Sequence, residues 1–208
     1  MTQQPIQFWF EFASTYSYLS AMRIEGMAKD AGVPIDWKPF LLGPIFRSQG
    51  WDTSPFNIYP AKGRYMWRDM ERLCMKYGIP FKRPTKFPRN GVLAARVACI
   101  GASEEWCPKF TKAVFRANFA EDRDISDPVI ISRILESLGL DGHQMIRRVE
   151  LPENKGLLRN QTERAIALGI FGAPTFVVGT EIFWGNDRLE DAIDWHKRQI
   201  QNSQVPLI

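Results

Sequence analysis

Ser14 is the residue whose type and position most favour chemistry. It follows an alternating apolar stretch typical of a strand and opens a stretch with helical spacing. The first turn of a helix presents free N–H groups and a partial positive charge, which favour an anion. A hydroxyl there can donate a hydrogen bond to a thiolate, by the same physics that lowers the pKa of a cysteine at a helix N-terminus. The same serine can instead only cap the helix, which is worth roughly 1 kcal/mol.

Two segments near the C-terminus also favour ligand binding. In the stretch 171–175, Pro174 opens a strand, and a cis Ala173–Pro174 bond would expose the Ala173 backbone to a ligand. In the stretch 183–188, N–H groups at a helix start can hold a carboxylate, while Asp187 can pair with an ammonium group. The alternative for this second segment is a plain turn and helix cap.

A third candidate is the basic, aromatic helix start at Lys62-Gly63-Arg64-Tyr65, with Arg68 one turn further on. Such a segment can meet an anionic ligand, or it can be an ordinary solvated helix face.

Other kinds of catalytic site have little support in the sequence. A Ser-His-acid triad would need His143 or His196, both expected at the surface, and no Gly-x-Ser-x-Gly segment occurs. So few histidines and scattered cysteines predict no metal site. The three cysteines form no Cys-x-x-Cys pair, which predicts free helical thiols in a reducing, cytoplasmic compartment: Cys74, Cys99 and Cys107.

The elements that must position these residues follow from apolar spacing. Residues 6–12 and 35–40 predict strands, joined by a helix that ends at Gly32, so a parallel pair with a crossover helix is expected. Residues 59–149 predict an all-helical block with helices over 66–77, 92–106, 110–117 and 131–138 and a short helix capped by Asp141. A helix over 153–168, a hairpin over 175–184 and a last helix opened by an Asp187-to-Glu190 capping box complete the order, with a frayed tail over 201–208.

This order predicts an α/β thioredoxin-like fold with a large all-helical insertion. We expect one unit over 1–208, with a thioredoxin-like lobe at about 1–58 and 150–200 and the insertion at about 59–149. The 208 residues are 45% hydrophobic, which suits a globular core, and the net charge of +4 is spread along the chain. No partner nucleic acid, membrane span or signal peptide is expected.

The motifs together resemble the 2-hydroxychromene-2-carboxylate isomerase family and the related kappa-class glutathione transferases, which are DsbA-like thioredoxin folds. The resemblance rests on the ordered set FEFASTYSYL at 10–19, FGAPT at 171–175 and WGNDRL at 184–189, with YGIP at 77–80 between them. It spans nearly the whole chain.

The resemblance implies a glutathione site. Ser14 would hydrogen-bond the glutathione sulfur, and Ala173, before a cis Pro174, would pair with the cysteinyl part. The γ-glutamyl end would lie against the segment Trp184, Gly185, Asn186 and Asp187. Because Ser14-Thr15-Tyr16-Ser17 replaces Cys-x-x-Cys, disulfide exchange by the protein itself is excluded.

The substrate side departs from the family pattern. The family's lysine after the second strand aligns with Phe46, beside Arg47, and its Asn-Arg pair aligns with Phe56-Asn57. A family tyrosine aligns with Phe87. We expect the substrate to contact Phe46, Arg47, Asn57, Lys62 and Phe87, with cationic or amide groups replacing those that are lost.

The implied activity is a glutathione-dependent isomerisation that forms trans-o-hydroxybenzylidenepyruvate in aromatic catabolism. Two alternatives stay open: a kappa-class-like transferase or peroxidase acting on a small electrophile, and a non-catalytic glutathione-binding protein. Relatives are commonly dimers, so a homodimer is expected.

Overall fold

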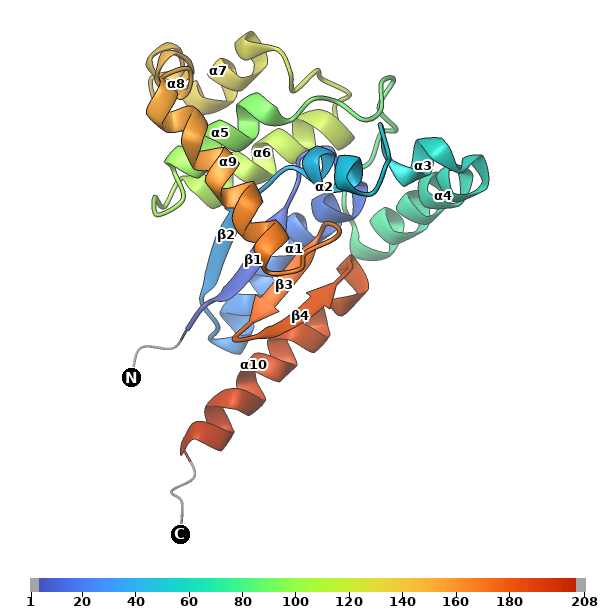
Figure 1. The fold of residues 1–208 in the computed structure, drawn as a ribbon, viewed down its shortest axis with the longest axis vertical. Coiled ribbons are helices and arrows are strands. Elements are labelled where there is room, and N and C mark those ends of the chain that lie inside the picture. Colours follow the sequence, from blue (N-terminus) through green and yellow to red (C-terminus); the bar gives the residue numbers. More distant parts are fainter. Residues whose placement is uncertain (1–3, 205–208) are drawn as a thin grey trace.

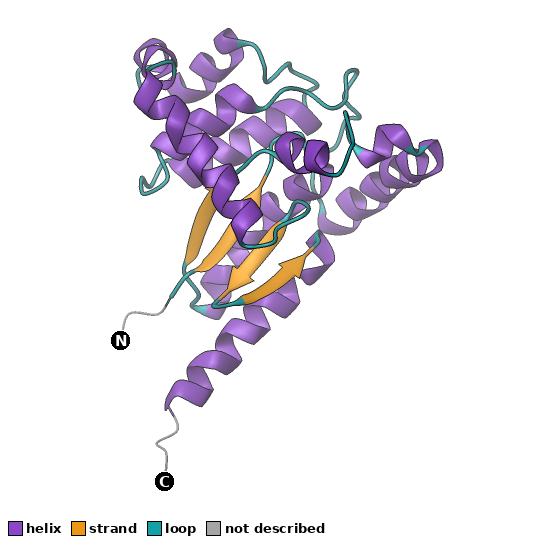
Figure 2. Cartoon of the chain, in the orientation of Figure 1, coloured by secondary structure: helices purple, strands orange, loops and turns teal. Residues whose placement is uncertain are grey.

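The chain folds around one four-stranded sheet, seen in a computed structural model that describes residues 4–204 (Figures 1 and 2). The strand order is β2-β1-β3-β4. The first strand, β1 (Ile6–Phe10), pairs in parallel with β2 (Ile35–Pro39), and the predicted parallel pair is confirmed. β1 also pairs antiparallel with β3 (Thr175–Val178), and β3 forms the predicted hairpin with β4 (Glu181–Trp184). The sheet is therefore mixed.

The helix α1 (Thr15–Ala31) connects the parallel strands and begins where the sequence predicts. Ser14 is its N-cap, and its oxygen accepts a hydrogen bond from the Ser17 N–H at 3.2 Å. Gly32 ends the helix in the left-handed conformation, with φ at 67°, which glycine adopts without steric cost. α1 thus starts at the carboxyl end of β1, where Ser14 is only partly buried.

Between β2 and β3 the chain is helical. The helices in this stretch are α2 (Leu42–Ser48), α3 (Pro55–Ile58), α4 (Pro60–Tyr77), α5 (Val92–Ile100), α6 (Cys107–Phe119), α7 (Pro128–Glu136), α8 (Gly142–Val149) and α9 (Pro152–Ala167). Figure 1 shows α5 to α8 gathered beyond one end of the sheet, while α3 and α4 project to the side. After the hairpin come the short 3-10 turn η1 (Asn186–Arg188) and α10 (Leu189–Gln204).

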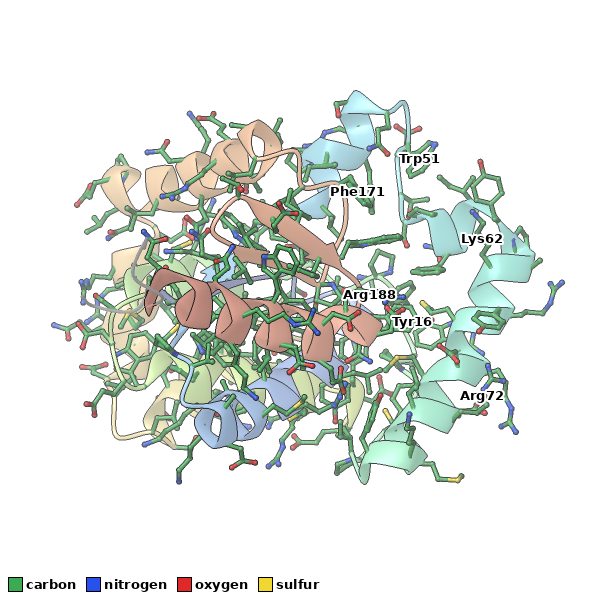
Figure 3. All side chains as sticks on the ribbon, turned by 90° about the horizontal axis from the view of Figure 1, so that it is seen from below. Tyr16, Trp51, Lys62, Arg72, Phe171 and Arg188 are labelled. Carbon is green, nitrogen blue, oxygen red and sulfur yellow. The ribbon has the colours of Figure 1, made fainter. Side chains whose placement is uncertain are left out.

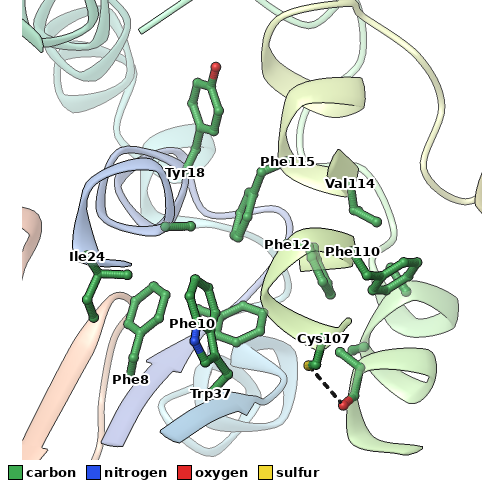
Figure 4. Close-up of a cluster of buried hydrophobic side chains, with 14 of the residues drawn as sticks. Phe8, Phe10, Phe12, Tyr18, Ile24, Trp37, Cys107, Phe110, Val114 and Phe115 are labelled. Atoms are coloured by element: carbon green, nitrogen blue, oxygen red, sulfur yellow. Dashed lines mark hydrogen bonds between the residues drawn. The ribbon is translucent and has the colours of Figure 1, made fainter. Parts of the chain in front are cut away.

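The two faces of the sheet are buried by different helices. On one face, Phe8, Phe10 and Phe176 join side chains of α1, α6 and α10 in the main core, whose aromatic rings pack edge to face and stacked (Figure 4). On the other face, Trp9 and Val177 pack with residues of α2 and α9 in a second cluster. Trp9 alternates with Phe8 and Phe10 along β1 and so lies on this second face, where α9 covers it and its side chain is completely buried.

Three local predictions are wrong. α5 stops at Ile100 instead of 106, because the ring of Trp106 occupies the space beside Gly101 and the chain turns there. α7 stops at Glu136, and Gly139 then reverses the chain with φ at 80°. The expected capping box of α10 is replaced by η1, and the Glu190 carboxylate pairs with Arg23 instead.

The thioredoxin-like fold with its helical insertion is confirmed, because the strand-helix-strand opening and the hairpin-helix ending form one sheet around the helical block. Two short helices, α2 and α3, precede position 59, in a stretch where no helix was predicted. The last helix continues to 204, and the rest of the tail expected to fray, 205–208, lies outside the described residues. Among the helices that the structure describes, none is long and apolar enough to cross a membrane.

Candidate functional site

A cleft of about 1690 Å³ lies at the carboxyl end of β1. Its walls come from the turn after β1, from α2 and α4, from the loop before α5, and from segments 171–174 and 184–188. Figure 3 shows Tyr16 and Lys62 on the helical side of this region and Phe171 and Arg188 on the side of the hairpin. Pockets for a single small molecule typically measure 300–1,000 Å³, so this cleft has room for two ligands side by side.

Ser14 lies in this cleft with both hydrogen-bonding capacities of its hydroxyl in use. The oxygen accepts from the N–H of Ser17, and the hydroxyl donates to the carbonyl oxygen of Ala173 at 3.0 Å. The backbone N–H of Ser14 is held by the carbonyl of Glu11 at 2.9 Å. The strand-to-helix turn therefore fixes Ser14 directly beside the start of β3.

The Ala173–Pro174 bond is cis. Ala173 lies just before β3 and lines the cleft, and the Pro174 carbonyl accepts a hydrogen bond from the Gly185 N–H at 3.0 Å. This bond ties the segment after β4 to the segment before β3. A second cis bond, Phe87–Pro88, lies in the loop on another wall of the cleft.

The segment 184–187 forms the wall beside the hairpin. Gly185 has φ at 115°, a conformation that favours glycine, and it lets the chain turn from β4 into η1. Asn186 is buried, and its Oδ1 accepts hydrogen bonds from Ser20 Oγ and Arg23, each at 3.1 Å. Asp187 is exposed, lines the cleft, and pairs with Arg188 at 3.4 Å. Of these residues, Asp187 is placed to meet a ligand and Asn186 to fix the turn.

Most of the residues expected on the substrate side line the same cleft. Phe46 packs against Trp51, with ring centroids 5.8 Å apart, and Phe87 packs edge to face on Trp67. Arg47 is exposed on α2, and Lys62 lies over the ring of Tyr59 at 4.8 Å.

Asn57 is the exception among the expected substrate contacts. It lies outside the cleft lining, and its amide donates to Thr53 Oγ1 at 3.2 Å and to the Phe87 carbonyl at 3.5 Å. The structure therefore places it behind the wall formed by Phe87 rather than facing the cleft.

The cleft also contains polar residues that the motifs do not single out. The Tyr16 hydroxyl donates to Asp69 Oδ2 at 3.0 Å, and burial together with the Asp69 charge raises the pKa of this tyrosine. Glu11 lines the cleft three residues before Ser14, and burial raises the pKa of its carboxyl from 4.5 to about 7. The detectable signal in the sequence is an acid placed where a strand should pass into a helix. Strand alternation alone would predict that the Glu11 side chain points away from the main core toward solvent.

The histidines and cysteines lie away from the cleft. His143 is exposed as predicted, but the prediction for His196 is wrong: its side chain is buried and its Nε2 lies 2.6 Å from the Gln4 carbonyl. The three cysteines are free, on helices, and burial raises the pKa of each to about 12. Over the described residues, no group of three or more His, Cys, Asp or Glu side chains is arranged to hold a metal ion.

Comparisons with family models, with known sequences and with solved structures all point to the same family. A family model described as a DSBA-like thioredoxin domain matches residues 5–194. The chain is 29% identical to a 2-hydroxychromene-2-carboxylate isomerase of Sphingobium xenophagum, over 89% of this chain and 94% of the relative. It is 24% identical to the human glutathione S-transferase kappa 1, over 89% of this chain and 87% of that protein.

A solved structure of a 2-hydroxychromene-2-carboxylate isomerase superimposes with a TM-score of 0.83 at 27% identity. It covers 97% of this chain and 100% of the other. The fold also matches that of the cytosolic disulfide reductase DsbM from Pseudomonas aeruginosa, solved with GSH, with a TM-score of 0.66 at 13% identity; the match covers 97% of this chain and 100% of that one.

Proposed function

Because the chain belongs to the DSBA-like thioredoxin domain family, we propose that it is a glutathione-dependent isomerase similar to 2-hydroxychromene-2-carboxylate isomerases. The proposed reaction is a cis/trans isomerisation that yields trans-o-hydroxybenzylidenepyruvate. The observation that carries the proposal is Ser14, which lies at the N-terminus of α1 and hydrogen-bonds to Ala173 before a cis proline. The relatives of Sphingobium xenophagum and Pseudomonas putida that bear the isomerase name support it.

The chemistry of the cleft fits glutathione. This tripeptide has a thiol, two amides, an ammonium group and two carboxylates. The cleft offers a hydroxyl at a helix N-terminus, a carbonyl at Ala173 outside the strand ladder, and a carboxylate at Asp187. When bound, glutathione supplies a thiolate that adds to an electron-poor double bond and leaves again after rotation.

In this proposal the Ser14 hydroxyl donates a hydrogen bond to the sulfur and favours its ionised form, helped by the partial positive charge of α1. Ala173 pairs with the cysteinyl backbone, next to Pro174. Asp187 pairs with the ammonium of the γ-glutamyl end, and the wall formed by Trp184 and Gly185 positions that end. Asn186 does not contact glutathione in this proposal. It fixes the turn by accepting hydrogen bonds from Ser20 and Arg23.

The opposite walls accept the aromatic substrate. Phe46 and Phe87 supply apolar faces for an aromatic ring, and Arg47 and Lys62 supply positive charge for its carboxylate. Asn57 contributes by holding the Phe87 backbone. We expect the enzyme to work as a cytoplasmic homodimer.

The test compares the amount of product formed with the amount of glutathione supplied. The protein is mixed with the chromene carboxylate and substoichiometric glutathione, and product is followed by absorbance. A catalyst that regenerates glutathione yields many products per glutathione. Product that stops at the amount of glutathione supplied contradicts the isomerase proposal.

That second result would favour a kappa-class-like transferase or peroxidase, in which glutathione is consumed. The specific observation in its favour is the match to kappa transferases of human and Caenorhabditis elegans, at 24% identity each. Binding of glutathione by calorimetry without any turnover would favour a non-catalytic binding protein.

A further inference from the structure

We propose that the carboxylate of Glu11 is the base that takes the thiol proton of bound glutathione and returns it at the end of each cycle. This rests on the proposed function. It concerns a residue outside the sulfur, peptide and substrate contacts assigned above.

The geometry places Glu11 on the same turn as Ser14 and in the lining of the same cleft. Its carbonyl accepts the Ser14 N–H at 2.9 Å, so the two residues share the turn that leads from β1 into α1. Its side chain lines the cleft, facing the loop before α5. There Gly91 lacks a side chain, and a Cβ at that position would meet Phe12 and come within 3.6 Å of Glu11 Oε1.

Among the residues that the structure describes, no cationic side chain pairs with the Glu11 carboxylate to hold it ionised. Burial dominates its ionisation, with only the Ala13 N–H acting in the opposite direction. The nearest candidate in sequence on the facing loop is Arg89, whose guanidinium is engaged by Asp122 and by carbonyls of Asn118 and Arg123. Glu11 is therefore free to accept a proton, unlike a carboxylate locked in an ion pair.

The other acids of the cleft are less suited to this task. Asp69 is held by the Tyr16 hydroxyl and by Arg72 at 3.0 Å, and Asp187 pairs with Arg188. Asp52 is exposed on the loop after α2. An ion pair or a hydrogen-bond donor stabilises the charged form of a carboxylate, whereas burial raises the pKa of the Glu11 carboxyl to about 7.

The reaction needs such a group because Ser14 cannot supply it. A serine hydroxyl stabilises a thiolate by donating a hydrogen bond, and it has no capacity to remove a proton near neutral pH. In the proposed step the S–H bond breaks, its electron pair stays on sulfur, and an O–H bond forms on Glu11. The site carries one negative charge before and after the transfer. It thus avoids two anions side by side in one cleft.

The test measures how many protons are released to the buffer when glutathione binds, rather than measuring turnover. Calorimetric titration of the full-length protein with glutathione is run about one pH unit above the pKa of Glu11, in two buffers of different ionisation enthalpy. Ultraviolet absorbance reports thiolate in the same samples. Wild type is expected to form thiolate and release almost no proton, because Glu11 keeps it.

Glu11→Gln is expected to form thiolate while releasing about one proton per site, and its turnover is expected to fall roughly 100-fold. Glu11→Asp retains a carboxylate and is expected to release almost none. Glu71→Gln, on the exposed face of α4 and outside the cleft, serves as the matched control and should behave as wild type.

Release of a full proton by wild type, with thiolate present, would overturn the role of Glu11 and leave the proposed function standing. S-methylglutathione, which has no thiol proton, separates the two proposals. If neither it nor glutathione binds to wild type, glutathione dependence fails, and the role of Glu11 falls with it.

Discussion

The hydroxyl of Ser14 donates its hydrogen bond to the carbonyl oxygen of Ala173 over 3.0 Å, across 159 positions of sequence. The same oxygen accepts from Ser17, so the residue caps α1 and ties it to the start of β3 at once. A hydroxyl has a single proton. It can therefore serve a sulfur only after turning away from Ala173, whose carbonyl then becomes available to an amide N–H of the ligand.

Replacing Ser14 separates its structural role from its catalytic one. Ser14→Ala removes a helix cap worth roughly 1 kcal/mol, so the protein should stay folded with a slightly lower Tm. Turnover should fall by about 10²-fold or more, because the thiolate loses its hydrogen-bond donor. Circular dichroism melting and initial rates check both expectations. Ser14→Thr, which keeps a hydroxyl, is the control, and wild-type turnover in folded Ser14→Ala would refute the assigned role.

Gly172 offers a purely steric test of the wall opposite Ser14. A Cβ at this position would overlap the indole of Trp184, and the residue is otherwise in an ordinary backbone conformation. Gly172→Ala should therefore displace Trp184 and weaken glutathione binding by roughly 10-fold, which corresponds to about 1.4 kcal/mol. Calorimetry measures the Kd.

The matched control for Gly172 is Gly156→Ala on α9, where a Cβ meets nothing within 4 Å. That change should leave binding unaltered and slightly stabilise the helix. Equal binding by the two alanine variants would contradict the place of Trp184 in the site.

Local signals explain why so much of the fold can be predicted. Gly32 and Gly78 end α1 and α4 in the left-handed conformation, and Asp141 caps α8 through its side chain. Each of these signals acts within a few residues, so it is readable without knowledge of the rest of the chain. The hairpin around Gly179 is of the same kind.

The features that escape prediction depend on distant contacts. Trp9 is buried because α9 returns to cover the second face of the sheet, and His196 is buried beside the segment before β1. Asn57 turns toward Thr53 and Phe87 because α3, itself unpredicted, carries it there. In the candidate site, Ser14 and Ala173 could be inferred from motifs. The raised pKa of Glu11 could not, because it results from burial that only the folded chain produces.

The cysteines provide a test that disulfide chemistry does not belong to this protein. Burial raises the pKa of the Cys74, Cys99 and Cys107 thiols from 9.0 to about 12. Near neutral pH the native thiols should therefore alkylate roughly 10³-fold more slowly than in unfolded protein. Labelling with iodoacetamide followed by mass spectrometry measures this. Cys99, which is only partly buried, should react first; fast native labelling of Cys74 or Cys107 would contradict the expectation.

Glu11 should make the stability of the protein depend on pH in a defined direction. Its pKa is 4.5 in the unfolded chain and about 7 in the folded one. Below 4.5 both states are protonated and the residue has no effect. Between these values the unfolded chain loses its proton first, so ionisation favours unfolding and the free energy of unfolding falls as pH rises. Above about 7 the full destabilisation is present.

Glu11→Gln removes this destabilisation. Near pH 4 the variant should have the same free energy of unfolding as wild type. Near pH 8 its free energy of unfolding should be higher by roughly 1–3 kcal/mol, and the difference should grow as the pH rises from one pKa to the other. Urea denaturation across this pH range measures it, with Glu71→Gln as the control for an exposed carboxylate. A difference that is constant with pH would mean that the pKa of Glu11 is the same in the folded and the unfolded chain, at its ordinary value of 4.5. In that case the residue would have no affinity for a proton near neutrality.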